Sequence, residues 1–330
     1  GGGGYVTAPG GITIAEATYP ITVGRGGVGM EFNDDDTYYA GFNGGNSLIN
    51  SPTVGIITAY GGGGGASRVP NIAAPARAGG SGGGAAYPSS GSPTGDRKGY
   101  GLSPTTPSPA LQYLRQNDVI ADPYSGPQQG YDGGTGPSAA SNPSGAGGGG
   151  ASAVGGDAVD GPGGAGAYGG DGGNGVATTY AYGPTNPQSF GGGGGGAGGT
   201  NPTKDPASAG SGGTGGGGRG AYGGGPWNTA PFGPTYEILG ADGTQGLGGG
   251  GGGGGCNAPT GPFPSSFNKG GNGGAGCVIV RYKIASAQTN TAAATGGAIS
   301  FSGGKTIHTF LIDGTFTSPT SLTDVAWLMF

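Results

Sequence analysis

The chain has 330 residues, of which 92 are Gly and 26 are Pro, and only 9 % are charged. The Gly share is roughly four times the average of about 7 %. A net charge of −5 argues against nucleic-acid binding, which depends on a basic surface. The longest apolar run is far shorter than the roughly 20 residues of a membrane span. We therefore expect neither a nucleic-acid partner nor a membrane span.

The aromatic content argues for a folded chain. A large aperiodic share of Gly and Pro is typical of low complexity or disorder, and collagen is excluded because Gly does not recur at every third position throughout. Disordered chains, however, are poor in aromatic residues and rich in charge. This chain contains 16 Tyr, 10 Phe and 2 Trp. We therefore favour a folded chain over the alternative of disorder throughout.

The first 60 residues predict a β-rich start. Ile12 and Ile14, and then Ile21 and Val23, alternate with polar partners, which is the period of a half-buried strand. Residues 11–23 therefore read as two strands around a short turn. A further strand is expected at 55–60.

Residues 61–276 change to glycine blocks, for example at 61–65, 147–150, 191–196 and 248–255. Segments rich in Pro, Asn, Asp, Ser and Tyr separate the blocks, and these residues favour turns. The one helix candidate is 109–119. Polyglycine must find partners for its backbone groups. In a polyproline II helix these groups point outward, and only Gly lets neighbouring helices approach to bonding distance. We predict a bundle of such helices with long loops.

The last 54 residues predict a β-rich end. Residues 277–284 form the clearest strand, and a linker follows at 285–295. Residues 305–312 and 315–317, with a turn at Asp313 and Gly314, predict a hairpin. The chain ends on an apolar strand at 325–330.

The predicted fold class is therefore mostly β and irregular, with almost no α-helix. It combines a small β-sandwich from the N- and C-terminal strands with a glycine-rich bundle of polyproline II type. The expected division is a β-rich start at 1–60, the bundle with its loops at 61–276, and the β-rich end at 277–330.

Motifs that carry catalytic chemistry are weak in this sequence. Residues 24–29 match G-x-G-x-x-G, but neither a helix nor a βαβ unit follows. The single histidine, His308, alternates with apolar Ile307. The sequence has no nucleophile-elbow context that would supply an activated serine for a catalytic triad with this histidine. We expect a structural His308, no catalytic residue and no cofactor.

Metal sites are also not expected. Residues 169–177 fit one calcium-binding nonapeptide, but neighbouring blocks do not repeat it. Glu31 with Asp34, Asp35 and Asp36 leaves a cation site as the alternative to a solvated acidic loop.

The two cysteines, Cys256 and Cys277, enclose a segment rich in Gly, Pro and Asn. An oxidised pair would stabilise the chain by about 3 kcal/mol. A disulfide and two free thiols both stay open as readings.

Aromatic residues in the predicted loops form the candidate recognition surface, because aromatic and small residues together give rigid contact area at low entropic cost. The alternative is that the rings pack over the glycine helices and close the ends of the bundle. The candidates are Tyr100, Tyr113, Tyr124, Tyr131, Tyr182, Trp227, Phe232 and Tyr236.

Residues 273–283, 306–310 and 314–317, together with the recurring glycine blocks, carry a resemblance. The sequence resembles the glycine-rich tail-fibre, adhesin and surface-fibre proteins of bacteriophages and bacteria. The resemblance implies a structural or adhesive subunit of an extracellular fibre. The implied partners are copies of the same chain, end to end, and a host surface receptor or glycan. Two alternatives stay open, a receptor-binding adhesin tip and a non-viral bacterial surface filament.

In the resembling proteins, a strand like 325–330 leads into a glycine block such as the one that begins this chain. We therefore expect the chain to be one unit of a longer polypeptide or filament. Val325, Trp327 and Met329 would then form an inter-unit strand beside the 12–23 strands of a neighbouring unit, since a lone apolar strand leaves an exposed edge.

Overall fold

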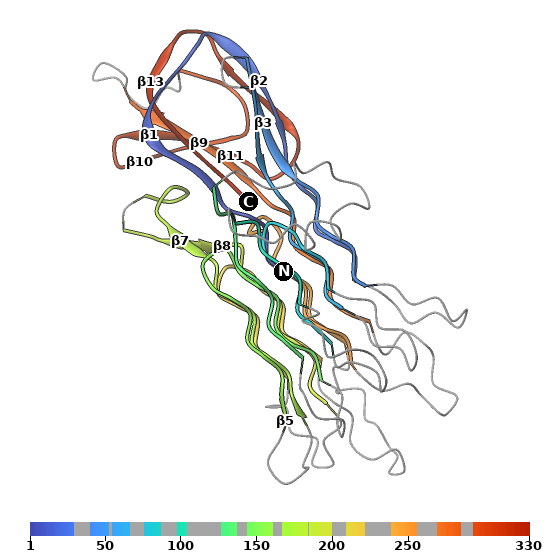
Figure 1. Cartoon of the computed structure of the whole chain (residues 1–330). Coiled ribbons are helices and arrows are strands. Elements are labelled where there is room, and N and C mark those ends of the chain that lie inside the picture. The colour runs from blue at the N-terminus through green and yellow to red at the C-terminus, as the bar shows by residue number, and fades with distance from the viewer. Residues whose placement is uncertain are drawn as a thin grey trace.

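The computed structural model describes residues 1–29, 40–52, 55–66, 76–86, 98–103, 127–136, 144–160, 167–183, 185–199, 209–221, 239–255, 269–284 and 293–330. A group of strands forms one end of the molecule, and extended segments run away from it side by side (Figure 1). The described residues contain strands and irregular segments and no helix, as predicted. The helix candidate at 109–119 lies outside the described residues.

Two antiparallel sheets form the strand-rich end. The first has the order β1-β13-β9-β11-β10 and the second the order β12-β2-β3-β4. Two short hairpins, β5–β6 and β7–β8, lie in the glycine-rich region. The strands are β1 (Val6–Ile14), β2 (Ala17–Thr22), β3 (Ser47–Ser51), β4 (Gly55–Ala59), β5 (Val159–Asp160), β6 (Ala167–Tyr168), β7 (Val176–Thr178), β8 (Gln188–Phe190), β9 (Val278–Lys283), β10 (Ala298–Ser302), β11 (Lys305–Phe310), β12 (Gly314–Ser318) and β13 (Leu322–Met329).

The five-stranded sheet is covered on both faces because the side chains of β9 and β13 alternate between two apolar clusters. Val280 and Trp327 face the four-stranded sheet and form a core with Tyr19, Phe316 and other residues of both sheets. Ile279 faces the opposite way, into a cluster that receives residues of the β7–β8 region. The predicted sandwich of N- and C-terminal strands is therefore present. The face of the five-stranded sheet that points away from the four-stranded sheet packs against the glycine-rich part.

The predicted hairpin at 305–317 is wrong. β11 pairs with β9 and β10, whereas β12 pairs with β2 in the other sheet. The turn at Asp313 carries the chain from one sheet to the other, and the Asp313 carboxylate accepts the N–H of Val23 at 2.8 Å. The Asp-Gly signal was correct for a turn, but the partner of each arm lies elsewhere in the sandwich.

The prediction of an inter-unit strand is also corrected. β13 lies between β1 and β9 of the same chain, with Trp327 opposite Ala8 on one side and Val280 on the other. Val325 and Met329 are fully buried in the sandwich core. Both edges of the strand are therefore occupied within the chain. Val325 pairs with Ile12 of the same chain, where a pairing with the next unit was expected.

The glycine-rich part begins earlier in the chain than the division at residue 61 implies. The segments 1–4, 24–29 and 41–45 hydrogen-bond to glycine blocks far away in the sequence, for example from the Gly44 N–H to the Gly62 carbonyl at 2.9 Å. The strand-forming and glycine-rich parts are therefore interleaved along the first 60 residues.

His308 is a structural strand residue, as predicted, and lies fully buried on β11. Its Nδ1 is 2.7 Å from the Gly296 carbonyl oxygen, and its Nε2 is 3.3 Å from the Tyr282 hydroxyl. That hydroxyl also accepts the Ala294 N–H at 3.0 Å. A neutral imidazole that donates from Nδ1 and accepts at Nε2 satisfies all three partners. Burial lowers the pKa of His308 and keeps it neutral.

We expect the stability of the chain to fall as the pH is lowered below about 6.5, the ordinary pKa of histidine. Below that pH the unfolded chain binds a proton that the folded chain, with its lowered His308 pKa, does not bind. The slope is at most about 1.4 kcal/mol per pH unit. Urea unfolding between pH 5 and 8, compared with a His308→Gln variant, isolates this contribution because His308 is the only histidine. Identical pH slopes in the two proteins would contradict the assignment.

Candidate functional site: a hydrogen-bonded glycine bundle

Extended segments outside the sandwich form a lattice of backbone hydrogen bonds, and we call each such segment a rod. In the rod 145–151, successive N–H groups point to three different neighbours, and every third one points to the same neighbour. Three residues per turn is the period of the polyproline II helix. The bonds, all 2.8–2.9 Å long, run from Gly145, Gly148 and Ala151 to Ala197, Gly194 and Gly191, from Ala146 and Gly149 to Ala85 and Gly82, and from Gly147 and Gly150 to Gly156 and Ala153.

The close approach of the rods explains the glycine content. A Cβ atom placed on Gly193 would collide with the carbonyl of Gly148 on the neighbouring rod, and the atoms next to it are also backbone atoms. A Cβ on Gly172 would collide with the Gly193 carbonyl in the same way. Backbone cannot move aside as the end of a side chain can, because each rod is bonded to further rods. Glycine at these positions is therefore a requirement of the packing.

Polar side chains at the borders of the bundle replace carbonyl groups as acceptors. They occur in pairs three residues apart, so both members lie on the same face of a rod with three residues per turn. Each side-chain oxygen accepts an N–H from a neighbouring segment. Asn43 and Asn46 accept from Gly64 and Gly61 at 2.9 and 3.0 Å, Asp171 and Asn174 from Ser211 and Thr214 at 2.7 and 3.1 Å, and Asp242 and Gln245 from Asn272 and Ala275 at 2.6 and 2.9 Å.

These border acceptors, the six residues just named, were missed by the sequence analysis. Residues 169–177 were considered only as a calcium-binding repeat, although Asp171 and Asn174 serve as hydrogen-bond acceptors for a neighbouring rod. The signal that identifies them is an Asp, Asn or Gln at positions i and i+3 inside a glycine block.

We expect Asp171→Ala to lower the free energy of unfolding by about 0.5–1.5 kcal/mol, the ordinary net value of one hydrogen bond. The variant leaves the Ser211 N–H without its acceptor, and that site is solvent-exposed, so water replaces part of the bond. Asp171→Asn keeps an acceptor oxygen and serves as the matched control. Urea unfolding of the three proteins measures the difference, and equal losses for Ala and Asn would contradict the acceptor role.

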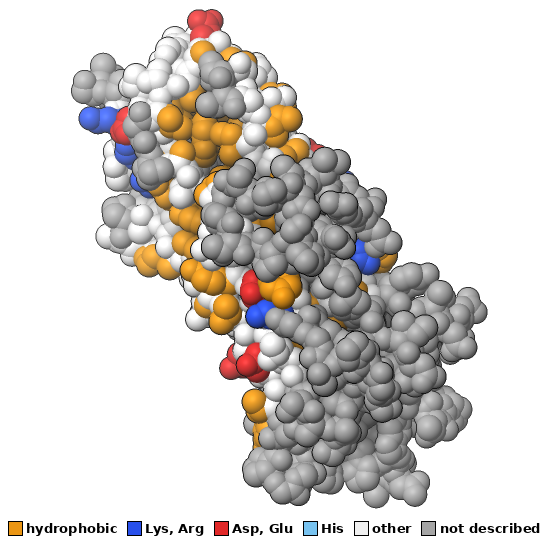
Figure 2. Space-filling view, viewed as in Figure 1, with side chains coloured by type: hydrophobic (Ala, Val, Ile, Leu, Met, Phe, Trp, Pro, Cys, Tyr) orange, Lys and Arg blue, Asp and Glu red, His pale blue; other side chains and the backbone are white. Residues whose placement is uncertain are grey.

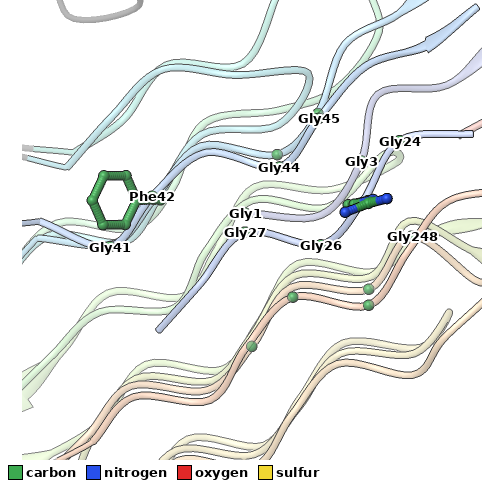
Figure 3. Close-up of a pocket in the computed structure, with 18 of the residues that line it drawn as sticks. Gly1, Gly3, Gly24, Gly26, Gly27, Gly41, Phe42, Gly44, Gly45 and Gly248 are labelled. Carbon is green, nitrogen blue, oxygen red and sulfur yellow. The ribbon is translucent and has the colours of Figure 1, made fainter. Parts of the chain in front are cut away.

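A glycine-lined groove runs between the rods next to the sandwich. Its walls come from segments 24–29, 41–45, 61–65, 248–251 and 271–276, with Gly1 at one end (Figure 3). Among the residues that line it, Arg25, Val28, Phe42 and Phe330 are the ones with side chains. The groove therefore offers mainly backbone N–H and C=O groups, which suits hydrogen bonding to another backbone better than acid–base chemistry.

Three of the predicted recognition residues lie in the described part, and they are not brought together. Tyr100 is half-buried against the cluster of Ala78 and Leu102. Tyr131 is a rod residue whose N–H donates to the Gly150 carbonyl at 3.1 Å. Tyr182 is 58 % exposed in the turn between β7 and β8. Tyr100 thus matches the alternative in which rings pack over the rods. Tyr113, Tyr124, Trp227, Phe232 and Tyr236 lie outside the described residues.

Of the two readings left open for the cysteines, the structure has the free thiol at Cys277. Cys277 is a free cysteine, buried where the start of β9 meets the bundle. Burial raises the pKa of its thiol to about 12, so it is protonated and unreactive at neutral pH. Cys256 lies outside the described residues.

The described surface carries few charged side chains on the face shown in Figure 2, where apolar side chains gather over the strand-rich end. In the described segments, no group of three or more His, Cys, Asp or Glu side chains is placed to hold a metal ion. Glu31 and Asp34–Asp36 fall outside those segments. The described residues also include no helix with the length and apolar character of a membrane span.

Comparisons with known proteins identify the family of the chain. A model of a family described as a glycine-rich domain matches residues 1–216, which is roughly two thirds of the chain. The comparisons with curated proteins and with solved structures gave no match. The match covers the first strands and most of the rods described above, so this chain belongs to the glycine-rich domain family.

Proposed function

We propose that this protein is a structural and adhesive subunit of an extracellular fibre, on a virion or on a cell surface, and that it is not an enzyme. The observation that carries the proposal is the three-neighbour lattice of backbone hydrogen bonds in the rod 145–151. A lattice of this kind joins every rod to several others without flexible side chains. It supports a mechanical role, in which a stiff body holds one end of the molecule away from the other.

The dimensions of the rods fit such a spacer. Polyproline II rises about 3.1 Å per residue, so the segment 192–199 spans about 25 Å. An α-helix of the same eight residues would span about 12 Å. The chain thus reaches further per residue than a helical bundle, at the cost of nearly excluding side chains from its interior.

The adhesive part of the proposal concerns the end of the bundle away from the sandwich. The coloured rods run away from the sandwich and end at the opposite end of the molecule (Figure 1). In the sequence, the segments that connect successive rods contain Tyr113, Trp227 and Phe232 among Pro, Asn and Ser. Aromatic rings among small polar residues are typical of recognition surfaces. A surface receptor or glycan is the partner that this composition favours.

Adhesion can be tested with the full chain on a glycan array and on bacterial cells. We expect binding that a combined Trp227→Ala and Phe232→Ala variant reduces at least tenfold, with unchanged thermal stability. Tyr100→Ala, a ring packed on the rods, is the control and should leave binding unchanged. A chain that binds neither glycans nor cells, or a double variant that binds normally, would contradict the adhesive role.

One observation favours a receptor-binding tip over a propagating fibre unit. β13 is paired on both sides within its own chain, so this strand is not free to dock on the next unit. A fibre unit makes head-to-tail contacts that propagate, whereas a tip ends the assembly. Electron microscopy of the purified chain distinguishes them, since filaments support the fibre unit and single particles that still bind support the tip.

A further inference from the structure

The rod at residues 1–4 lies at one end of the glycine-lined groove and shows how a segment is held there. The Gly1 and Gly4 nitrogens donate to the carbonyls of Gly63 and Tyr60 at 2.7 and 2.8 Å. The two donors are three residues apart, and so are the two acceptors. The residue numbers of the donors rise from 1 to 4 while those of the acceptors fall from 63 to 60. This rod therefore runs antiparallel to the segment 60–66 with the three-residue period of the rest of the bundle.

The same rod is held from two other sides. The Gly2 N–H donates to the Gly149 carbonyl at 2.9 Å, and the Gly3 N–H donates to the Gly248 carbonyl at 2.8 Å. A Cβ on Gly62 would collide with the carbonyls of Gly1 and Gly2, so the contact in this line is backbone against backbone.

The pattern of acceptors continues beyond Gly1 along the groove. One period further on, the next acceptors after Gly63 and Gly248 are the carbonyls of Ala66 and Gly251. Among the described residues, neither carbonyl accepts a hydrogen bond. Both segments are otherwise well bonded, since Gly62, Gly64 and Gly65 accept from other rods.

The opposite wall of the groove shows the same property. In the rod 24–29, the carbonyls of Gly24 and Gly27 accept from one neighbouring rod, and those of Arg25 and Val28 accept from another. The third face, formed by the carbonyls of Gly26 and Gly29, has no donor within the described residues. Gly26, Gly27 and Gly1 lie around the same opening in Figure 3.

We propose that this groove is a binding site for one extended, glycine-only segment joined in line with Gly1, antiparallel to residues 60–66. The segment would donate to the Ala66 and Gly251 carbonyls, one period on from the bonds that Gly1 and Gly3 donate to Gly63 and Gly248. The groove selects glycine because its walls are backbone, and in the rod that the segment continues a Cβ on Gly1 or Gly2 would collide with carbonyl oxygens of the adjoining rods. This site is independent of the proposed fibre or adhesin role.

The test is to extend the chain by four glycines ahead of Gly1 and, as a matched control, by four serines. The two extensions have the same length and similar polarity, but serine carries a Cβ. We expect the glycine extension to raise the thermal midpoint by a few degrees and the serine extension to leave it unchanged.

Amide hydrogen exchange gives a readout at the site itself. In the glycine-extended chain, the amides of the first and third glycines ahead of Gly1 should exchange at least about tenfold more slowly than amides of an unstructured chain, because they donate to the Gly251 and Ala66 carbonyls. In the serine-extended chain the corresponding amides should exchange at the unstructured rate. Equal shifts of the thermal midpoint for the two extensions, or unprotected amides at these two added glycines, would overturn the proposal.

Discussion

Replacing Gly193 by Ala is expected to lower the free energy of unfolding by at least about 3 kcal/mol. Overpacking in a close-packed interior typically costs 1–3 kcal/mol, and more where the surroundings cannot move. The added methyl group would collide with the Gly148 carbonyl, and the Gly149 carbonyl oxygen lies only 2.7 Å away. Both belong to a rod whose N–H groups are bonded on three sides, so relief would require breaking several hydrogen bonds. Urea unfolding followed by circular dichroism measures the loss.

Two other glycines provide controls with the same substitution. A Cβ on Gly65, which is exposed, would have no neighbour closer than the Gly84 carbonyl oxygen at 3.9 Å. A Cβ on Gly3, which is buried, would meet its nearest atoms at 3.4 and 3.5 Å, an ordinary contact distance. Gly→Ala without strain stabilises by about 0.4–1 kcal/mol through the unfolded chain. If Gly→Ala at Gly65 and Gly3 lowered the free energy of unfolding as much as at Gly193, then glycine would be required for its backbone conformation and not for the packing between rods.

The elements that the sequence predicted well are those with a local signal. The alternation of Ile12, Ile14, Ile21 and Val23 gave β1 and β2, and the apolar run after Cys277 gave β9. The glycine blocks predicted rods because polyglycine has few other ways to satisfy its backbone. Each of these inferences needs only the residues of the element itself.

The partners of the elements could not be predicted in the same way. The turn at Asp313 connects two sheets instead of two neighbouring strands, and the choice depends on Val23, 290 residues away. β13 pairs with β1 at the other end of the chain, and its apolar side chains alone do not show whether the partner lies in the same chain. Strand pairing depends on residues far apart in the sequence. The predicted hairpin and the predicted inter-unit strand were both wrong because a local pattern was used to choose the pairing partner.

The candidate site was also only partly predictable. That neighbouring rods bond backbone to backbone followed from the chemistry of glycine, but the groove depends on which rods are neighbours. The border acceptors have a simple sequence signal, which acquires a meaning only when three residues per turn is known to be the period. In the sequence, Asp171 and Asn174 therefore fit only a single calcium-binding nonapeptide that neighbouring blocks do not repeat, whereas in the structure they are acceptors for a neighbouring rod.

A small aromatic cluster lies at the junction between the sandwich and the bundle. We expect Phe330→Ala in this cluster to lower the free energy of unfolding by about 3–5 kcal/mol, which is the usual cost of Phe→Ala in a core. The Phe330 ring stacks on Phe190 of β8 at 4.9 Å between centroids and lies 5.4 Å from Tyr5. It thus joins the outer face of the five-stranded sheet to the start of a rod. Differential scanning calorimetry measures the loss.

The control is Phe301→Ala on the edge strand β10, where the ring is 37 % exposed and the expected change is within about 0.5 kcal/mol. The main chain of residue 330 stays bonded in the Phe330 variant, because its N–H donates to the Cys277 carbonyl at 3.1 Å and its carbonyl accepts the Ser47 hydroxyl at 2.5 Å. The substitution therefore removes ring packing while keeping the strand in place. If the ring couples the two parts, the calorimetric transition of the Phe330 variant should lie well below that of Phe301→Ala. A single transition lowered no more than in Phe301→Ala would mean that the hydrogen bonds alone hold the bundle to the sandwich.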